Sequence, residues 1–135
     1  MKKRLKLAGI ILVILVIGSL IWWFVPAHLC SIDAQQVEKI QIFDGNRGVK
    51  FEISDSGDID YLINSWDQVS MKKERVILAG MGGFKFKVTV CFKSGKTEQF
   101  TINTEDVVKK EILVYRRVKG DVCYEYIDTL AENAR

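Results

Sequence analysis

The stretch FKFKVTVCFK at residues 84–93 decides the fold class. Its apolar side chains alternate strictly with polar ones or Cys91, so that Phe84, Phe86, Val88, Val90 and Phe92 fall on one side. This period of two is typical of a strand with one buried face. We therefore expect Phe86 and Val88 to point into the core of an antiparallel sheet that has a single apolar face.

Two further strands are expected next to this one. Ser94-Gly95-Lys96 predicts a turn into a strand at residues 97–103, with Phe100 and Ile102 available to the core. On the other side, residues 71–78 form a weaker strand that ends at the glycine-rich residues 79–83. A phosphate-binding loop lies between a strand and a helix, whereas a strand follows here. We interpret the glycines as a flexible connection between strands.

A hairpin and a helix precede these strands. Residues 37–43 and 49–53 flank the turn-rich DGNRG at residues 44–48. In residues 56–67 the period changes, because Ile59, Leu62, Ile63 and Trp66 follow the helical spacing i, i+3, i+4 and i+7. Ser54 or Asp55 can cap this helix, and Asp58 lies in its first turn. We expect Ile63 to face the core strand.

The C-terminal part predicts one more strand and one more helix. After a polar connection around residues 104–110, the strand covers residues 112–118 and stops at Gly120. Asp121 can cap a final helix, whose apolar residues are Val122, Cys123, Tyr126, Ile127 and Leu130. Each helix has one apolar stripe that must be covered. We predict an α+β domain of order ββαββββα, with a small antiparallel sheet covered by two helices.

The N-terminal region predicts a membrane-spanning helix. Residues 7–25 contain no charged residue, and a helix of that length spans about 28 Å. Lys2, Lys3, Arg4 and Lys6 precede it, so the positive-inside rule places the N-terminus in the cytoplasm and Trp22 and Trp23 at the outer interface. The predicted parts are a cytoplasmic basic segment (1–6), a transmembrane helix (7–25), a juxtamembrane linker (26–36) and an extracytoplasmic domain (37–135). We expect a single-pass protein of the cell membrane.

The residues after the apolar run favour an anchor that is not cleaved. A secretory signal has a shorter apolar region and small residues at its cleavage site. Here the residues before Cys30 end in the bulky Leu29, which also disfavours a lipoprotein signal. Cleavage, and lipid attachment at Cys30, stay open as alternatives. We expect Cys30 to be an ordinary thiol of the linker, accessible from outside, and His28 to lie at the level of the lipid headgroups.

The charge balance argues against a nucleic-acid-binding domain. The chain has 20 basic and 17 acidic residues, but four of the basic ones precede the apolar run. The remainder has a net charge of −1. Because nucleic-acid-binding domains normally carry a clear basic excess, we predict no nucleic-acid partner.

The cysteines give weak support for a disulfide. An extracytoplasmic domain can oxidise its thiols, and three cysteines allow one pair. Cys91 is predicted to point away from the apolar face of its strand, whereas Cys123 lies on the apolar side of its helix. This geometry disfavours a bond between them, and we interpret Cys123 as a small buried apolar residue.

No catalytic, cofactor-binding or metal-binding residue is predicted. The acid pairs Asp58/Asp60 and Glu105/Asp106 could serve acid–base chemistry or Ca²⁺ binding. The first pair lies at a helix start and the second in a loop, where the helix dipole and solvation explain them. The sequence has no Cys-x-x-Cys, His-Glu-x-x-His or EF-hand motif. We therefore expect no cofactor.

Five stretches, read together, resemble a family of small single-span membrane proteins from Firmicutes, which have an extracytoplasmic α+β domain and no assigned function. They are FDGNRG (43–48), FEISDSGDIDYLIN (51–64), AGMGGFKFKV (79–88), FTINTEDVVKK (100–110) and GDVCYEYIDTL (120–130). The resemblance covers about residues 40–130. It implies a Gram-positive cell surface, and it transfers no catalytic residue to this chain.

Three functions are compatible with these features. The first is a membrane-anchored, non-catalytic extracytoplasmic domain that binds a protein, a peptide or an envelope component, or regulates one. The second is a small cell-surface enzyme whose carboxylates converge only in the fold, and the third is an accessory subunit of a membrane complex. A concave pocket lined by carboxylates with displaced pKa values would favour the enzyme.

Overall fold

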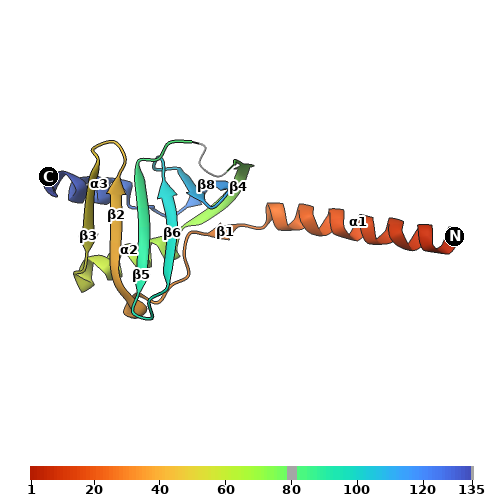
Figure 1. Ribbon diagram of the computed structural model, residues 1–135, viewed down its shortest axis with the longest axis horizontal. Helices are drawn as coiled ribbons and strands as arrows, with labels where there is room; N and C mark the ends of the chain where they lie inside the picture. The colour runs from red at the N-terminus through yellow and green to blue at the C-terminus, as the bar shows by residue number, and fades with distance from the viewer. Residues whose placement is uncertain (79–81, 135) are drawn as a thin grey trace.

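The computed structural model describes residues 1–78 and 82–134 (Figure 1). The elements are α1 (Lys2–Phe24), β1 (Ala27–His28), the 3-10 helix η1 (Ala34–Gln36), β2 (Val37–Asp44), β3 (Val49–Ile53), α2 (Ser56–Asp67), β4 (Ser70–Val76), β5 (Phe86–Phe92), β6 (Thr97–Ile102), β7 (Val107–Lys110), β8 (Leu113–Lys119) and α3 (Tyr124–Asn133). Most of the glycine-rich connection expected at residues 79–83 lies outside the described residues.

The strands form one antiparallel sheet, as predicted. The strand order is β1-β4-β8-β7-β6-β5-β2-β3, and every neighbouring pair is antiparallel. Helices α2 and α3 cover one face of this sheet, and α1 projects from the edge formed by β1 and β4 (Figure 1). The α+β class is confirmed, and none of the helices formed by the described residues covers the opposite face of the sheet. We call it the outer face.

The core lies between the sheet and the two helices. Phe86 and Val88 on β5 are fully buried, as is Ile63 on α2, so the predicted inward faces are confirmed. Trp66 packs its ring edge-on against Phe100, with 5.1 Å between ring centroids. Its indole nitrogen donates to the Val122 carbonyl oxygen at 2.9 Å, which satisfies its polar group inside the core.

The start of α2 is confirmed, and the start of α3 is corrected. Asp55 caps α2 by accepting from the backbone N–H groups of Gly57 and Asp58. Helix α3 begins at Tyr124 and not after Asp121, because Cys123 has a left-handed backbone with φ 62°. The Asp121 side chain accepts from the Cys123 backbone N–H at 2.7 Å, and this bond holds the turn before the helix.

Strand β7 lies within the region expected to be a polar connection. The connection has only two apolar residues, Val107 and Val108, and this is too short a pattern to show a period. Pairing with β6 and β8 on both sides extends these residues into a strand, and Val108 is fully buried. The order therefore has one more strand between α2 and α3 than predicted, because tertiary pairing decides this segment.

The segment expected to be a juxtamembrane linker is part of the folded domain. Strand β1 pairs with β4, and Leu29 and Cys30 are both buried in the core. The folded part therefore begins about ten residues before the predicted start at residue 37. Cys30 is therefore not an accessible linker thiol, and the expectation that a reagent outside the cell can reach it was wrong.

Helix α1 is long and apolar enough to cross a membrane. It starts at Lys2 and runs through the basic segment into the apolar run, so the two are one helix. Its C-terminal end contacts the domain at β4, where the Lys73 ammonium donates to the Trp22 carbonyl oxygen at 2.8 Å and lies over the Trp22 ring. A cation above an indole ring is a favourable contact, and it ties α1 to the sheet edge.

Candidate binding surface

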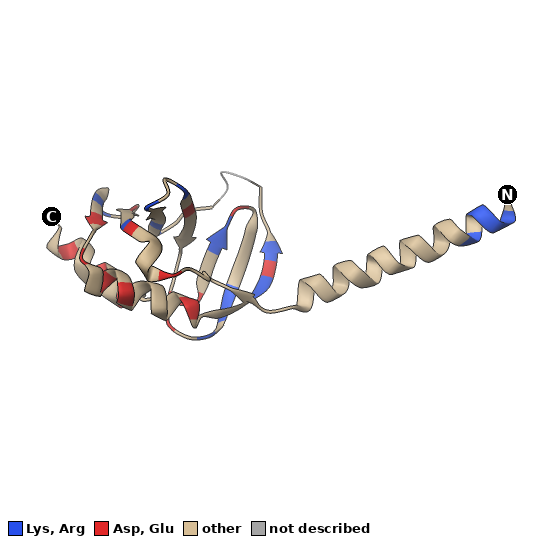
Figure 2. Cartoon of the chain, turned by 90° about the horizontal axis from the view of Figure 1, so that it is seen from below, with Lys and Arg blue, Asp and Glu red and all other residues tan. Residues whose placement is uncertain are grey.

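The fold separates charges that are mixed along the sequence (Figure 2). Helices α2 and α3 contain acidic residues and no lysine or arginine: Asp58, Asp60, Asp67, Glu125, Asp128 and Glu132. The strands carry most of the basic residues of the domain: Lys39, Lys50, Lys72, Lys73, Arg75, Lys87, Lys109, Lys110, Arg116, Arg117 and Lys119. The net charge of −1 therefore conceals an acidic helical layer and a more basic sheet.

Asp44 is a buried carboxylate at the end of β2. Its side chain accepts from the backbone N–H groups of Asn46 and Arg47 at 2.9 and 3.1 Å. It also forms ion pairs with Arg47 at 2.8 Å and with Lys85 at 3.3 Å. Burial alone would raise the pKa of Asp44, but these hydrogen bonds outweigh it and hold the pKa at about 2. Asp44 is thus ionised and fully partnered.

Arg47 joins this turn to helix α3. Its guanidinium contacts Asp128 at 2.5 Å and Glu132 at 3.0 Å, and Lys85 contacts Asp128 at 3.3 Å. The hydrogen bond from Arg47 lowers the pKa of Asp128. The five charged groups form a structural network that fixes α3 on the β2–β3 turn, and all of them are already paired.

One member of each predicted acid pair, Asp58 and Asp106, has a structural role. Asp58 accepts a 2.5 Å hydrogen bond from the Tyr126 hydroxyl, and this bond raises the pKa of Tyr126 to about 12. It connects the start of α2 to α3. Asp106 forms a 2.6 Å ion pair with Arg117, which links the approach to β7 with β8. The fold does not bring either pair together into a carboxylate site.

The cysteines stay apart in the structure. All three are free thiols, and Cys30 and Cys123 are buried. Burial raises the pKa of Cys30 to about 12 and that of Cys123 to about 11. Such thiols are protonated at neutral pH and react poorly. Cys91 is half-buried and lies on the outer face, opposite the core side on which Cys123 packs, as predicted.

A row of basic residues crosses the outer face. The register aligns Lys50 on β3 with Phe43 on β2, Phe43 with Lys87 on β5, Lys87 with Thr101 on β6, and Thr101 with Lys109 on β7. Directly paired residues point to the same side of a sheet. We call these five residues the cation row. Its lysines lie on alternate strands, and the row contains no acidic residue.

A second row of uncharged polar side chains lies beside the cation row. Gln41, Thr89 and Gln99 are aligned by the same register, and the Gln99 amide donates to the Thr89 hydroxyl at 3.1 Å. Two adjoining hollows of about 320 and 440 Å³ open over the two rows, and Lys87 and Gln99 line both. Glu111 is at the rim of the smaller one. The surface offers cations, amides, hydroxyls, the Glu111 carboxylate and aromatic rings that include Phe43 and Phe84.

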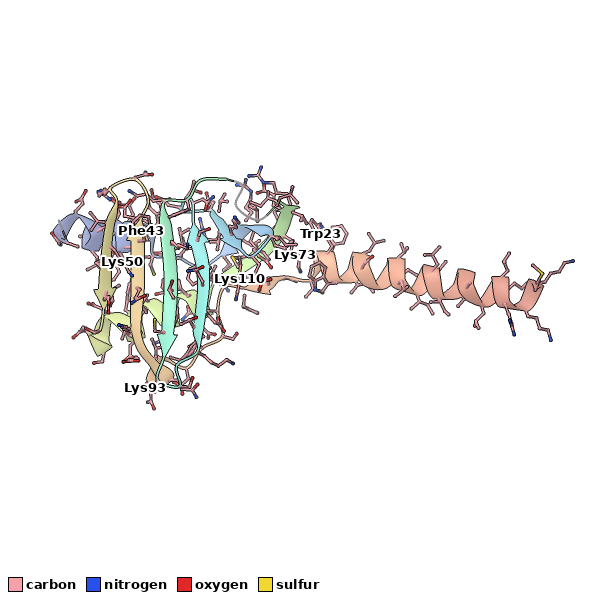
Figure 3. All side chains as sticks on the ribbon, viewed as in Figure 1. Trp23, Phe43, Lys50, Lys73, Lys93 and Lys110 are labelled. Atoms are coloured by element: carbon pink, nitrogen blue, oxygen red, sulfur yellow. The ribbon has the colours of Figure 1, made fainter. Side chains whose placement is uncertain are left out.

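Two lysines of the cation row form no ion pair with the described residues, although the charge of Lys50 contributes to the lowered pKa of Glu52. Within residues 1–78 and 82–134, neither Lys50 nor Lys87 forms an ion pair, and both are exposed. Phe43 lies between them and is 36% exposed. Figure 3 shows Phe43 and Lys50 on neighbouring strands of the outer face.

Comparison with protein-family models, curated proteins and solved structures gave no match.

Only part of this surface was predictable from the sequence. The alternation in β5 placed Lys87 and Thr89 on the polar side of their strand, but a polar strand face normally indicates only solvent exposure. The row arises from β3, β2, β5, β6 and β7, whose alignment depends on pairings between distant segments. The net charge of the residues after residue 25 could not reveal the cation row, because a sum over the chain does not show which face of the sheet each charge lies on.

Proposed function

We propose that this protein is a membrane-anchored extracytoplasmic binding domain that acts without catalysis. Helix α1 would stay in the cell membrane as a single span, with the N-terminus in the cytoplasm. The domain would bind an envelope component through the outer face of its sheet. Tethering raises the local concentration of such a domain at the membrane, so a modest interface is sufficient for function. A cell-surface location also agrees with the resemblance to the Firmicutes family.

The observation that carries this proposal is the difference between the two sheet faces. On the helical side, the charged network around Asp44 and Arg47 is saturated by its own members. On the outer face, Lys50 and Lys87 are exposed beside two open hollows. Unsatisfied cations next to a hollowed, partly aromatic surface are suited to a ligand, whereas the paired groups are suited to stability.

The enzyme alternative has a carboxylate-lined hollow, of about 330 Å³ with Glu52, Asp55 and Asp58 in its lining, but not the upward pKa shift of a general acid. Three carboxylates have resolved pKa shifts, namely Asp44, Glu52 and Asp128, and all three shifts are downward because of basic partners or hydrogen bonds. A general acid would need a raised pKa instead. In the described part of the chain, no group of three or more His, Cys, Asp or Glu side chains could hold a metal ion. Likewise, no contact favours an accessory-subunit role for α1.

Photocrosslinking in intact cells tests the binding surface. A benzoylphenylalanine replacing Thr89 on the outer face is expected to crosslink to an extracytoplasmic component, because this residue lies beside the cation row and lines the larger hollow. The same probe replacing Asp60, which is exposed on α2, is the matched control. Products are compared by mass on denaturing gels. Adducts that form from position 60 and not from position 89 would contradict the assignment of the outer face.

Thiol labelling tests the topology. The exposed Lys93 lies at the turn between β5 and β6, so Lys93→Cys in a Cys91→Ser background provides one reactive thiol. The buried Cys30 and Cys123 give little background. We expect a membrane-impermeant maleimide to label this variant in intact cells, as detected by a mass shift. Labelling only after permeabilisation would place the domain in the cytoplasm and reverse the proposed orientation.

A further inference from the structure

We infer that the cation row binds a linear polymer that carries phosphate groups at regular intervals. This inference rests on the proposed function, since it names the ligand class of that same surface. It follows from the spacing of the cations, from the groups between them, and from the direction of the row relative to α1.

The spacing of the lysines favours a repeating polyanion over a single anion. Neighbouring strands lie about 4.8 Å apart, so Lys50, Lys87 and Lys109 are separated by roughly 9.5 Å per step. At this separation the three ammonium groups do not converge on one small ion. They extend over about 19 Å of sheet, a span over which only an extended ligand reaches all of them.

The chemistry of the surface favours phosphates over a peptide. An extended peptide normally binds by adding a strand to a sheet edge, where backbone groups are free. The row instead crosses β2, β5 and β6, whose backbones are paired on both sides, so only side chains are available. A lysine ammonium is a point charge that donates hydrogen bonds to phosphate oxygens in many directions. The Gln41 and Gln99 amides donate to Glu52 and to Thr89, and each amide has a second N–H that can reach an ester oxygen.

The direction of the row argues against the bilayer surface as its ligand. The strand order begins with β1 and β4 next to α1 and ends with β3, which lies farthest along the sheet (Figure 1). With α1 in the membrane, the row leads away from the bilayer, from Lys109 toward Lys50. A flat lipid surface would reach one end only. A polymer that extends outward from the membrane can follow the whole row.

The test uses the full chain in uncharged detergent micelles and fluorescently labelled long-chain inorganic polyphosphate. Counterion release makes the logarithm of the binding constant fall with the logarithm of salt concentration. We expect Lys50→Gln and Lys87→Gln each to weaken binding about fivefold at low salt and to reduce this slope by about one. The matched controls, Lys93→Gln and Lys96→Gln, remove the same charge at the β5–β6 turn and are expected to change binding less than twofold. Thermal melting confirms that all four variants are folded.

Competition experiments define the ligand class. Orthophosphate at the same total phosphate concentration should compete poorly, and poly-glutamate of similar charge should compete less well than unlabelled polyphosphate. Absence of polyphosphate binding, or equal losses in the row and control variants, would overturn the inference. Equal competition by orthophosphate would rule out a polymer site, and stronger competition by poly-glutamate would indicate an acidic peptide. None of these outcomes removes a crosslink from position 89, so the proposed function is tested separately.

Discussion

Replacing Ile63 with aspartate is expected to unfold the domain. Ile63 has no exposed surface on α2 and belongs to the same buried cluster as Phe86 and Val88 of β5. An aspartate there would bury an unpaired charge, or its neutral form without a hydrogen-bond partner, and would also remove apolar packing. We expect a cost on the order of 5 kcal/mol, which is comparable with the whole stability of a small domain. Thermal melting of the full chain in detergent, followed by circular dichroism, measures the loss.

The neighbouring Asn64→Asp is the matched control. Asn64 is exposed on the same helix, so this variant adds the same negative charge one position away without burying it. Its melting temperature is expected to stay within a few degrees of that of the wild type. If Ile63→Asp melted together with Asn64→Asp, Ile63 would not lie in the core.

The elements with a strong local pattern were predictable. Helix α2 has its four apolar residues at helical spacing and an aspartate at its N-cap, and its observed bounds match the predicted residues 56–67. Strand β5 alternates over its whole length, and its inward residues Phe86, Val88 and Val90 are buried, whereas Phe92 at its end is partly buried. In both elements, local propensity and tertiary packing favour the same conformation, so the sequence alone is sufficient.

The elements that depend on distant partners were not predictable. Strand β7 has four residues and is defined by β6 and β8, and β1 has two residues and is defined by β4. Cys123 shows the same limit at a helix end. Its apolar character fitted the helical stripe, but its left-handed φ and the hydrogen bond from its backbone N–H to Asp121 delay the start of the helix to Tyr124, two residues after the predicted first residue. Such a hydrogen bond between a side chain and the backbone competes with helix formation, and the spacing of apolar residues does not reveal it.

The candidate site was predictable only as a polar strand face. Lys87 was correctly assigned to the solvent side of β5, yet its place in a row with Lys50 and Lys109 depends on a strand order that joins β2 to β5 across residues 45–85. The buried network was also hidden. Asp44 stood in a turn-rich DGNRG stretch, where an aspartate normally indicates a solvent-exposed turn. In the structure the same residue is the only buried charged one among those described.

Replacing Asp44 with asparagine is expected to be nearly as damaging as the Ile63 substitution. Asparagine has the same shape, but it is neutral and directs an amide group toward Arg47 or Lys85, which are cations. Removing one partner from a buried ion pair typically costs about 3–5 kcal/mol, because the remaining charge is left uncompensated. Asp128 still contacts both cations, which places the expected loss toward the lower end of this range. Asp60→Asn removes an exposed carboxylate from α2 and is expected to be almost neutral.

The pH dependence of this loss identifies its cause. The pKa of Asp44 is about 2 in the folded protein and 3.8 ordinarily, so its stabilising contribution is complete above pH 4 and declines as the pH falls from about 4 to 2. The difference in melting temperature between the wild type and Asp44→Asn should therefore be constant from pH 7 to 5 and shrink below pH 4. Asp128 and Glu52 titrate in both proteins, so comparison of the two removes most of their contribution. A difference that stays the same at pH 3 would show that Asp44 acts through shape and backbone hydrogen bonds, and not through its charge.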